Sequence, residues 1–382
     1  MRSDKYQILH MSPNFLIEGG QVLLLNTLQA GNSRLFKHHV AVPWKKAEEP
    51  LRKEFTAIDV KTIVLNLRRS LLPLIILRLV FYVLRNRIDL IHTNTTKWDT
   101  RIGLIVGRMT GRPVINTFHT MRYPNTLREK EWSRFRGVVS AVVAVSTPVA
   151  QEWESCIQAL GVASSNVRLI YPGVKSRFLQ PASTTAINEL RTELKVHPDG
   201  EKFGPVLTIV ARLVDGKGHE YLPHVLKTLV RKHPHLQLLV VGEGPLRQEI
   251  EKSFQTAGVS DHVTMLGKRR DVPEILAISD LFIFPSRGEG FGMSVLEAMA
   301  MGVPVVAFDI PALRDFFKDG KYGNLIELGS AEKLAESAAT ILDDTAVHDA
   351  MSRSARDAAS NFTIGNTAKV LEELWLEVID KK

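Results

Sequence analysis

Short apolar runs alternate with longer amphipathic stretches along most of this chain. In the first half, runs typical of buried strands occur at 6–12, 38–44, 88–94, 113–120 and 141–147. A second series follows at 206–212, 236–244, 262–268, 281–286 and 303–309. Stretches with helical periodicity separate the runs in both series. This alternation predicts an α/β protein whose parallel sheets are covered by helices on both faces.

Chain length and one proline-containing interval divide this pattern into two domains. A chain of 382 residues exceeds what one ordinary hydrophobic core supports. The interval 171–200 separates the two series of strands and contains Pro172, Pro181 and Pro198. We therefore predict an N-terminal domain at 1–178 and a C-terminal domain at 179–365.

Composition and charge narrow the class of protein. Hydrophobic residues make up 45% and charged residues 24% of the chain, as in soluble globular proteins. The single cysteine, Cys156, excludes an intramolecular disulfide, and no signal peptide is expected because no long apolar run follows the N-terminal charges. Residues 1–175 contain 25 lysines and arginines against 12 acidic residues, a net charge of +13, whereas the rest carries −5. The basic half could face anionic lipid, nucleic acid or a phosphorylated substrate.

The apolar segment 66–89 has two interpretations. It is too short to span a bilayer and contains Pro73. The favoured interpretation is a helix that faces the core and leads into the strand at 88–94. The alternative is a helix on a membrane surface, with Phe81 and Tyr82 in the interface and arginines near anionic lipid: Arg68, Arg69, Arg78, Arg85 and Arg87. The two are compatible, because a helix can bury one face and expose another.

Candidate site residues are sought at the carboxyl ends of the strands, where ligands of open parallel sheets bind. Arg212 ends one strand, and Lys217 follows it between Gly216 and Gly218. Two cations beside the start of a helix predict a clamp for a phosphate or diphosphate, and a solvated turn is the alternative. Gly242 lies in VVGEGPLR, a dinucleotide fingerprint without its third glycine, which disfavours a dehydrogenase.

Two carboxylates follow the strand at 281–286. Ser294 and Glu297 have the S-x-x-E spacing of a capping box, which by itself would explain Glu297. Glu289 lies among glycines in the loop before them, and no capping role accounts for it. A carboxylate there can accept hydrogen bonds from hydroxyl groups, so a hydroxyl-rich ligand is indicated.

Two further candidates follow strands of the first series. His119 could donate a hydrogen bond to a ligand or be a satisfied buried histidine. Gly19 and Gly20 form a predicted glycine loop after the first strand. They could offer backbone N–H groups to a phosphate or simply make a tight turn.

Together these motifs resemble the retaining glycosyltransferases of family four ("group 1"), which have the GT-B fold. EGFGMSVLEAMAMGVPVVA, at 289–307, is similar to the E-x7-E signature of that family. Gly19-Gly20, TFHT, AVST, YPGV, ARLVDGKG, VVGEGP and PSRGEGFG follow the family's order and approximate spacing, so the resemblance covers most of the chain. It implies two facing Rossmann-like domains with a cleft between them. It also implies a C-terminal helix, about 366–382, that packs back on the first domain.

The resemblance implies roles for the charged residues. Arg212 and Lys217 would neutralise the diphosphate of a nucleotide-sugar donor in place of a metal ion, so no cofactor is expected. Glu289 would contact hydroxyls of the transferred sugar, and Glu297 would hold hydroxyls of the ribose. The family retains the anomeric configuration, with the leaving phosphate helping to deprotonate the acceptor. No nucleophile or dedicated base is therefore assigned.

It also implies roles for uncharged residues. Phe291 and Gly292 would offer backbone N–H groups to the sugar or the diphosphate, and Gly242 would lie near the nucleotide. His119 would reach the donor sugar, and the loop at Gly19-Gly20 would approach the phosphates.

We therefore expect a hexosyltransferase of cell-surface polysaccharide or glycolipid synthesis. It would move a hexose or N-acetylhexosamine from a nucleotide-sugar, a UDP-sugar in preference to a GDP-sugar, to a glycan or lipid-linked acceptor. The charge of the first half suggests a peripheral location on the cytoplasmic face of an anionic membrane, with no nucleic-acid partner. The alternatives are a GT-B-like sugar-nucleotide epimerase, which needs no acceptor, and a non-catalytic sugar- or nucleotide-binding subunit.

Overall fold

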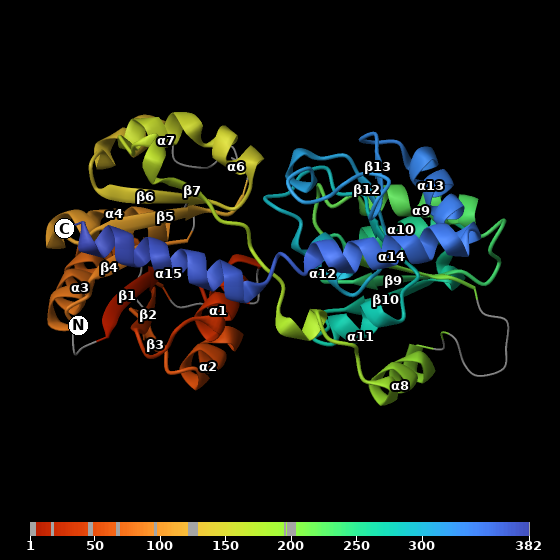
Figure 1. Ribbon diagram of the computed structural model, residues 1–382, viewed down its shortest axis with the longest axis horizontal. Helices are drawn as coiled ribbons and strands as arrows, with labels where there is room; N and C mark the ends of the chain where they lie inside the picture. The colour runs from red at the N-terminus through yellow and green to blue at the C-terminus, as the bar shows by residue number, and fades with distance from the viewer. Residues whose placement is uncertain are drawn as a thin grey trace. The chain divides into compact units, whose positions relative to one another are not determined.

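The computed structural model describes residues 5–16, 19–44, 49–65, 69–94, 98–120, 129–194, 196 and 204–381. The chain divides into two compact units: unit 1 is Met1–Gly173 with Ile364–Lys382, and unit 2 is Val174–Thr363. Each unit contains a parallel sheet with helices on its faces (Figure 1). The predicted α/β class is confirmed. The sequence pattern predicts the division at 178/179, and the family resemblance implies the return of the chain near 366.

Unit 1 is built on a seven-stranded sheet in the order β3-β2-β1-β4-β5-β6-β7. Its strands are β1 (Tyr6–Met11), β2 (Phe36–Val42), β3 (Lys61–Val64), β4 (Leu90–Thr93), β5 (Val114–Phe118), β6 (Val139–Ala144) and β7 (Val167–Leu169). Its α-helices are α1 (Gly19–Ala30), α2 (Pro50–Ala57), α3 (Leu72–Arg85), α4 (Trp98–Thr110), α5 (Glu129–Trp132), α6 (Thr147–Glu152), α7 (Glu154–Leu160) and α15 (Ile364–Asp380). Short 3-10 helices are η1 (Arg69–Leu71), η2 (Ser133–Phe135) and η3 (Ser164–Asn166).

Unit 2 is built on a six-stranded sheet in the order β10-β9-β8-β11-β12-β13. Its strands are β8 (Val206–Val210), β9 (Gln237–Val241), β10 (Val263–Gly267), β11 (Leu281–Phe284), β12 (Val305–Phe308) and β13 (Gly323–Ile326). Its α-helices are α8 (Thr184–Leu194), α9 (Leu222–Leu229), α10 (Arg247–Ala257), α11 (Val272–Ala277), α12 (Met293–Ala300), α13 (Ala331–Asp343) and α14 (Thr345–Ala359). Its 3-10 helices are η4 (Ser176–Phe178), η5 (His219–Tyr221), η6 (Ser260–His262) and η7 (Pro311–Leu313).

The predicted strands are all present, and the three that were not predicted are edge strands. β3 and β7 form the edges of the first sheet, and β13 forms one edge of the second. Each has only three or four residues, and most of these are partly exposed. Short edge strands need no continuous apolar run, so the hydrophobic pattern does not reveal them.

Helix α15 closes the core of unit 1 beside α1 (Figure 1). Its Trp375 is 1% exposed and meets the buried rings of three histidines from β1, β2 and β4. The centroid distances are 5.5 Å to His10, 5.4 Å to His38 and 5.9 Å to His92. His10 Nε2 and His38 Nδ1 share a hydrogen bond of 3.1 Å. The core of this unit is therefore partly built from neutral imidazoles.

Helix α3 has one buried and one exposed apolar face. Ile75, Leu79 and Val83 are completely buried, as the core-facing interpretation predicts. The opposite face exposes a stripe of large apolar side chains: Leu74 (38%), Leu77 (60%), Phe81 (63%) and Leu84 (54%). In the alternative interpretation, Tyr82 enters a membrane interface with Phe81. Its hydroxyl instead lies 2.7 Å from His39 Nδ1 on the core side, and its side chain is only partly exposed.

Part of the predicted segment lies outside the described residues, namely 66–68 with Arg68, and the side chain of Arg69 is also not described. Within the described part of the chain, no helix has the length and apolar character needed to cross a bilayer.

Candidate active site

The strand order of unit 2 places the candidate donor site beside β8 and β11. From β8 the chain continues to β9 and β10 on one side, and then crosses to β11 on the other side of β8. Ligands of doubly wound sheets bind at such a switch point, at the carboxyl ends of the strands. Arg212 and Lys217 follow β8, and Glu289 and Glu297 follow β11. The sequence-predicted charged residues thus all come from the two connections at this point.

Lys217 and Glu289 form an ion pair that links the two loops. Lys217 Nζ lies 2.5 Å from Glu289 Oε1, and the buried Ser286 donates its hydroxyl to the same oxygen at 2.9 Å. Only 18% of the lysine side chain and 17% of the glutamate side chain are exposed. Partial burial reduces solvent screening, so the pair is stronger than one on the open surface. The structure brings two predicted site residues into direct contact.

Close backbone packing holds the loop that carries Lys217. Gly218 has a φ of +76°, and a Cβ at this position would lie 1.8 Å from the carbonyl oxygen of Pro285. The backbone N–H of Arg287 donates to the carbonyl of Gly216 at 2.9 Å. Only glycine fits such an approach, so the loops after β8 and β11 support each other directly.

Arg212 extends from the end of β8 and is exposed. Among the residues that the structure describes, its guanidinium has no hydrogen bond or ion pair. Gly242 packs against Ala211, the residue before Arg212, since a Cβ on Gly242 would lie 1.9 Å from the carbonyl oxygen of Ala211. The close approach expected at Gly242 is thus made by the protein's own backbone, and its contact with a nucleotide stays a prediction.

Glu297 is not a capping residue. Helix α12 begins directly after Gly292, its N-cap, so Ser294 lies inside the first turn and the capping-box prediction is wrong. Burial raises the pKa of the Glu297 carboxyl to about 7, although the cations Arg177 and Lys175 lower it in part. Within the described ranges, no hydrogen bond reaches this carboxyl. A half-buried carboxyl with a raised pKa and no donor among the described residues is typical of a binding or catalytic position.

Phe291 and Gly292 lead into helix α12. The Phe291 ring is 4% exposed and stacks on Phe316, with 4.7 Å between the ring centroids. This packing fixes the loop after Glu289 from the inside. The first N–H groups of a helix lack acceptors within it, so the start of α12 can offer N–H groups to an anion.

Gly19 and Gly20 are the first two residues of α1, so the predicted glycine loop is wrong. A Cβ at either position would meet no protein atom within 4 Å. The packing of the described residues therefore does not require glycine here. The backbone N–H groups of this helix start remain suited to an anion.

His119 lies directly after β5 in unit 1. Burial lowers the pKa of its imidazole to about 4, so the ring is neutral at neutral pH. Its Nε2 is buried and has no partner in the described part of the chain, and the same holds for His92 Nδ1 and Asn94 Nδ2. All three residues line a cavity of about 30 Å³. The alternative of a fully satisfied buried histidine does not fit, and a polar ligand group or water suits these atoms.

Several polar residues around the unit 2 loops were not among the residues predicted from the sequence. Ser286 stands just beyond β11, and Lys175 and Arg177 directly follow the YPGV motif. Because these residues stand at or near the ends of recognisable motifs, the sequence alone could have identified them as candidate site residues. His219 follows the Lys217 loop and is 2% exposed, with its pKa lowered to about 4 by burial and then by the charge of Lys217.

Two family models match the chain and together span most of it. "Glycosyltransferase Family 4" matches residues 17–178, and "Glycosyl transferases group 1" matches residues 193–358. The chain therefore belongs to the family 4 glycosyltransferases of the GT-B fold, and it catalyses glycosyl transfer. Its two units are the two Rossmann-like domains of that fold.

Similar proteins support this assignment along most of the chain. The UDP-Gal:alpha-D-GlcNAc-diphosphoundecaprenol alpha-1,3-galactosyltransferase of Escherichia coli is 27% identical over 308 residues, which cover 78% of each chain. Alpha-D-kanosaminyltransferase of Streptomyces kanamyceticus is 26% identical over 72% of this chain and 73% of its own. The crystal structure of HepE from Anabaena in complex with UDP has a TM-score of 0.81 at 23% identity, covering 97% of this chain and 99% of HepE.

Proposed function

We propose that this glycosyltransferase is a retaining, metal-independent enzyme that transfers a hexose or N-acetylhexosamine from a UDP-sugar. The acceptor is a glycan or a lipid-linked glycan of cell-surface polysaccharide or glycolipid synthesis. The observation that carries the proposal is the Lys217–Glu289 pair at the switch point of unit 2. The E. coli relative takes UDP-Gal and a diphosphoundecaprenol-linked acceptor by its name, and HepE binds UDP, which supports this choice of donor and acceptor.

Donor binding exchanges the partner of Lys217. A diphosphate oxygen replaces Glu289 as the anion at Lys217 Nζ, and Arg212 supplies a second cation from the same loop. Glu289, released from the pair, accepts hydrogen bonds from hydroxyls of the transferred sugar. Ser286 continues to orient its carboxylate. The ion pair thus holds both side chains in place until the donor arrives.

The remaining donor contacts follow from α12 and its surroundings. The carboxylate of Glu297 accepts hydrogen bonds from the ribose hydroxyls, which supply the donors that this carboxyl lacks within the described residues. N–H groups of Phe291 and Gly292 contact the sugar or the diphosphate, and Gly242 lies near the nucleotide. In unit 1, the resemblance to the family assigns His119 to the donor sugar and Gly19-Gly20 to the phosphates.

The chemistry consists mainly of stabilising the nucleoside diphosphate as it leaves. Arg212, Lys217 and the start of α12 supply preorganised positive charge for this group, so no metal ion is needed for it. The leaving phosphate takes the proton of the acceptor hydroxyl on the same face of the sugar. The sugar anomeric carbon keeps its configuration, and no protein side chain acts as a nucleophile.

The exposed stripe of α3 supports a peripheral place on the cytoplasmic face of an anionic membrane. Leu77 and Phe81 are the most exposed members of this stripe. Arg78, Arg85 and Arg87 are exposed on or next to the same helix. An apolar stripe flanked by arginines inserts into the headgroup region while the charges meet anionic lipid.

A donor screen and the stereochemistry of the product test the proposal. UDP-sugars should raise the melting temperature more than GDP-sugars, equally with and without EDTA. With an acceptor, NMR of the product should show the anomeric configuration of the donor. An inverted product, or turnover abolished by EDTA, would contradict the mechanism. A new sugar nucleotide formed without acceptor would support the epimerase, and binding without any turnover would support the non-catalytic subunit.

A further inference from the structure

A second pocket lies in unit 1, at the opposite end of the sheet from His119. It has a volume of about 640 Å³, within the usual range of small-molecule sites. Its walls come from the turn between α4 and β5, the start of β6, the turn after α7 and the last turns of α15. His119 follows the carboxyl end of β5, whereas the pocket includes Pro113, directly before the amino end of this strand. The pocket is therefore separate from the candidate active-site residues of this unit.

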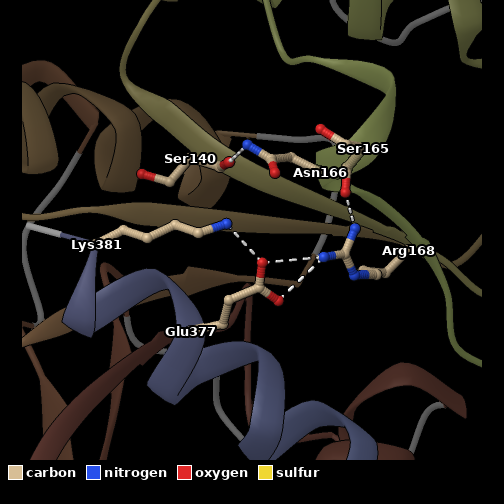
Figure 2. A network of polar contacts seen from close by, with 6 residues as sticks. All are labelled: Ser140, Ser165, Asn166, Arg168, Glu377 and Lys381. Carbon is tan, nitrogen blue, oxygen red and sulfur yellow. Dashed lines mark hydrogen bonds and ion pairs between the residues drawn. The ribbon is translucent and has the colours of Figure 1, made fainter.

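The lining of the pocket carries unbalanced positive charge. Its charged residues are Arg108, Arg112, Arg136, Lys381 and Glu377. Figure 2 shows that the carboxylate is already neutralised, since Glu377 meets Arg168 Nη2 at 3.0 and 3.1 Å and Lys381 Nζ at 2.6 Å. In the described ranges no carboxylate pairs with any of the three arginines. Three guanidinium groups therefore share one concave surface, and the described residues supply no counter-ion to them.

The walls of the pocket hold two of the three arginines in place and leave a donor of the third unpaired among the described residues. Arg108 donates from Nη1 to the carbonyl of Arg134 at 3.0 Å. The side chain of Arg136 lies flat on Gly161, where a Cβ would come within 2.9 Å of its Cγ and Nε. Arg112 Nε is buried, and no acceptor for it exists among the described residues. A buried guanidinium donor without an acceptor is costly, so this position favours a ligand oxygen.

We propose that this pocket binds a phosphate-bearing ligand at a site distinct from that of the sugar donor. Guanidinium groups match phosphate oxygens in geometry and charge, and three of them converge here. The three arginines also account for part of the net charge of +13 in residues 1–175, which does not contribute to the donor site in unit 2. One wall is the end of α15, so the bound ligand also strengthens the attachment of this helix to unit 1.

Titration with inorganic pyrophosphate tests the proposal. The titrations use the Lys217→Ala background, which weakens the binding of the same probe at the donor site. Arg112→Ala, and separately the double variant Arg108→Ala/Arg136→Ala, should each weaken pyrophosphate binding by at least about tenfold. The matched control Arg34→Ala changes an exposed arginine of unit 1 outside the pocket and should leave the affinity unchanged.

Two measurements separate this proposal from that of the donor site. With Lys217 intact, the double variant should bind UDP as tightly as the wild type. Its melting temperature without ligand should also stay unchanged, because both arginines are exposed. Pyrophosphate affinity that is the same in all pocket variants, or lowered equally by Arg34→Ala, would overturn the phosphate site. If the single variant Lys217→Ala loses UDP binding, this result bears on the proposed donor site and leaves the test of the pocket unaffected.

Vesicles identify the source of the phosphate. If it belongs to a lipid headgroup, the double variant should reduce co-sedimentation with phosphatidylglycerol vesicles, and pyrophosphate should compete with them. If it belongs to a soluble molecule, the double variant should bind these vesicles like the wild type while still failing to bind pyrophosphate. Both results support the site and assign its source. Vesicle binding lost with unchanged pyrophosphate affinity would contradict it.

Discussion

Acid should unfold unit 1 before unit 2, because the buried histidines of unit 1 resist protonation in the folded state. Burial lowers the pKa of His38 and His92 to about 3, that of His39 and His119 to about 4, and that of His10 well below 6.5. Neighbouring histidines add to this effect at His10, His38 and His92, and Lys61 and Lys37 add to it at His39. In unit 2, burial and then the charge of Lys217 lower the pKa of His219 to about 4.

The direction and size of this change in the free energy of unfolding of unit 1 follow from proton linkage. In the unfolded chain each histidine takes up a proton as the pH falls through 6.5, whereas the folded state does so only near its own lower pKa. The stability that these neutral histidines provide is complete above pH 6.5 and is lost as the pH falls toward 4 and 3. Between pH 6 and pH 5 the loss is about 1.2 kcal/mol for each histidine, or about 6 kcal/mol for five. That is as large as the whole stability of many domains.

Calorimetry between pH 7.5 and pH 5 measures this loss, and limited proteolysis with mass spectrometry assigns each transition to its unit. His38→Phe keeps a ring between Phe36 and Trp375 but removes one titrating group, so the loss between pH 6 and pH 5 should shrink by about 1.2 kcal/mol. His224→Gln changes an exposed histidine and should leave the slope unchanged. Equal acid sensitivity of the two transitions, or an unchanged slope in His38→Phe, would refute the reasoning.

Three further predictions concern the donor site and the membrane face. Lys217→Ala and Glu289→Gln should each lower kcat/KM for sugar transfer by roughly 10² to 10³, because each removes a preorganised charge. The control Lys227→Ala, on the exposed face of α9, should leave kcat/KM unchanged. If Glu289→Gln transferred sugar at the full rate, Glu289 would not belong to the site. The affinity for UDP should fall by about tenfold from pH 8 to pH 6, because the carboxyl of Glu297 has a pKa of about 7 and its ionised form is the much stronger acceptor for the two ribose hydroxyls. Calorimetric titration of wild type and Glu297→Gln checks this, since the variant should lose the pH dependence. The double variant Leu77→Ser/Phe81→Ser should reduce binding to anionic vesicles without lowering the melting temperature. The control Leu328→Ser, which changes an exposed leucine of unit 2, should change neither quantity. Equal effects of the double variant and the control would argue against α3 as the membrane face.

The fold was largely predictable because both sheets are parallel and buried. Such strands are nearly continuous apolar runs, and these runs stand out between amphipathic helices. The elements that escaped prediction, β3, β7 and β13, are short strands at the sheet edges with partly exposed side chains. The helix start at Ser146 was predictable from local chemistry alone, and its hydroxyl does accept the N–H of Val149 at 3.3 Å.

The boundaries that failed depend on tertiary packing. The S-x-x-E spacing at Ser294 and Glu297 indicates a cap, yet α12 starts earlier, at a Gly292 held with a φ of +105°. The stacking of Phe291 on Phe316 fixes the chain at that point. Two adjacent glycines predict a loop at Gly19 and Gly20, but these residues start α1, and residue type alone does not distinguish the two cases.

The residue types of the candidate site, their order and their positions after strands can be predicted from the chain alone, because they are properties of the sequence and of its hydrophobic period. Which of these residues meet depends on the three-dimensional fold. Lys217 and Glu289 are 72 residues apart and form an ion pair because β8 and β11 are neighbours in the sheet. Arg112 and Lys381 line one pocket because α15 returns to unit 1. Contacts of this kind depend on sheet order and helix docking, and a local pattern contains neither.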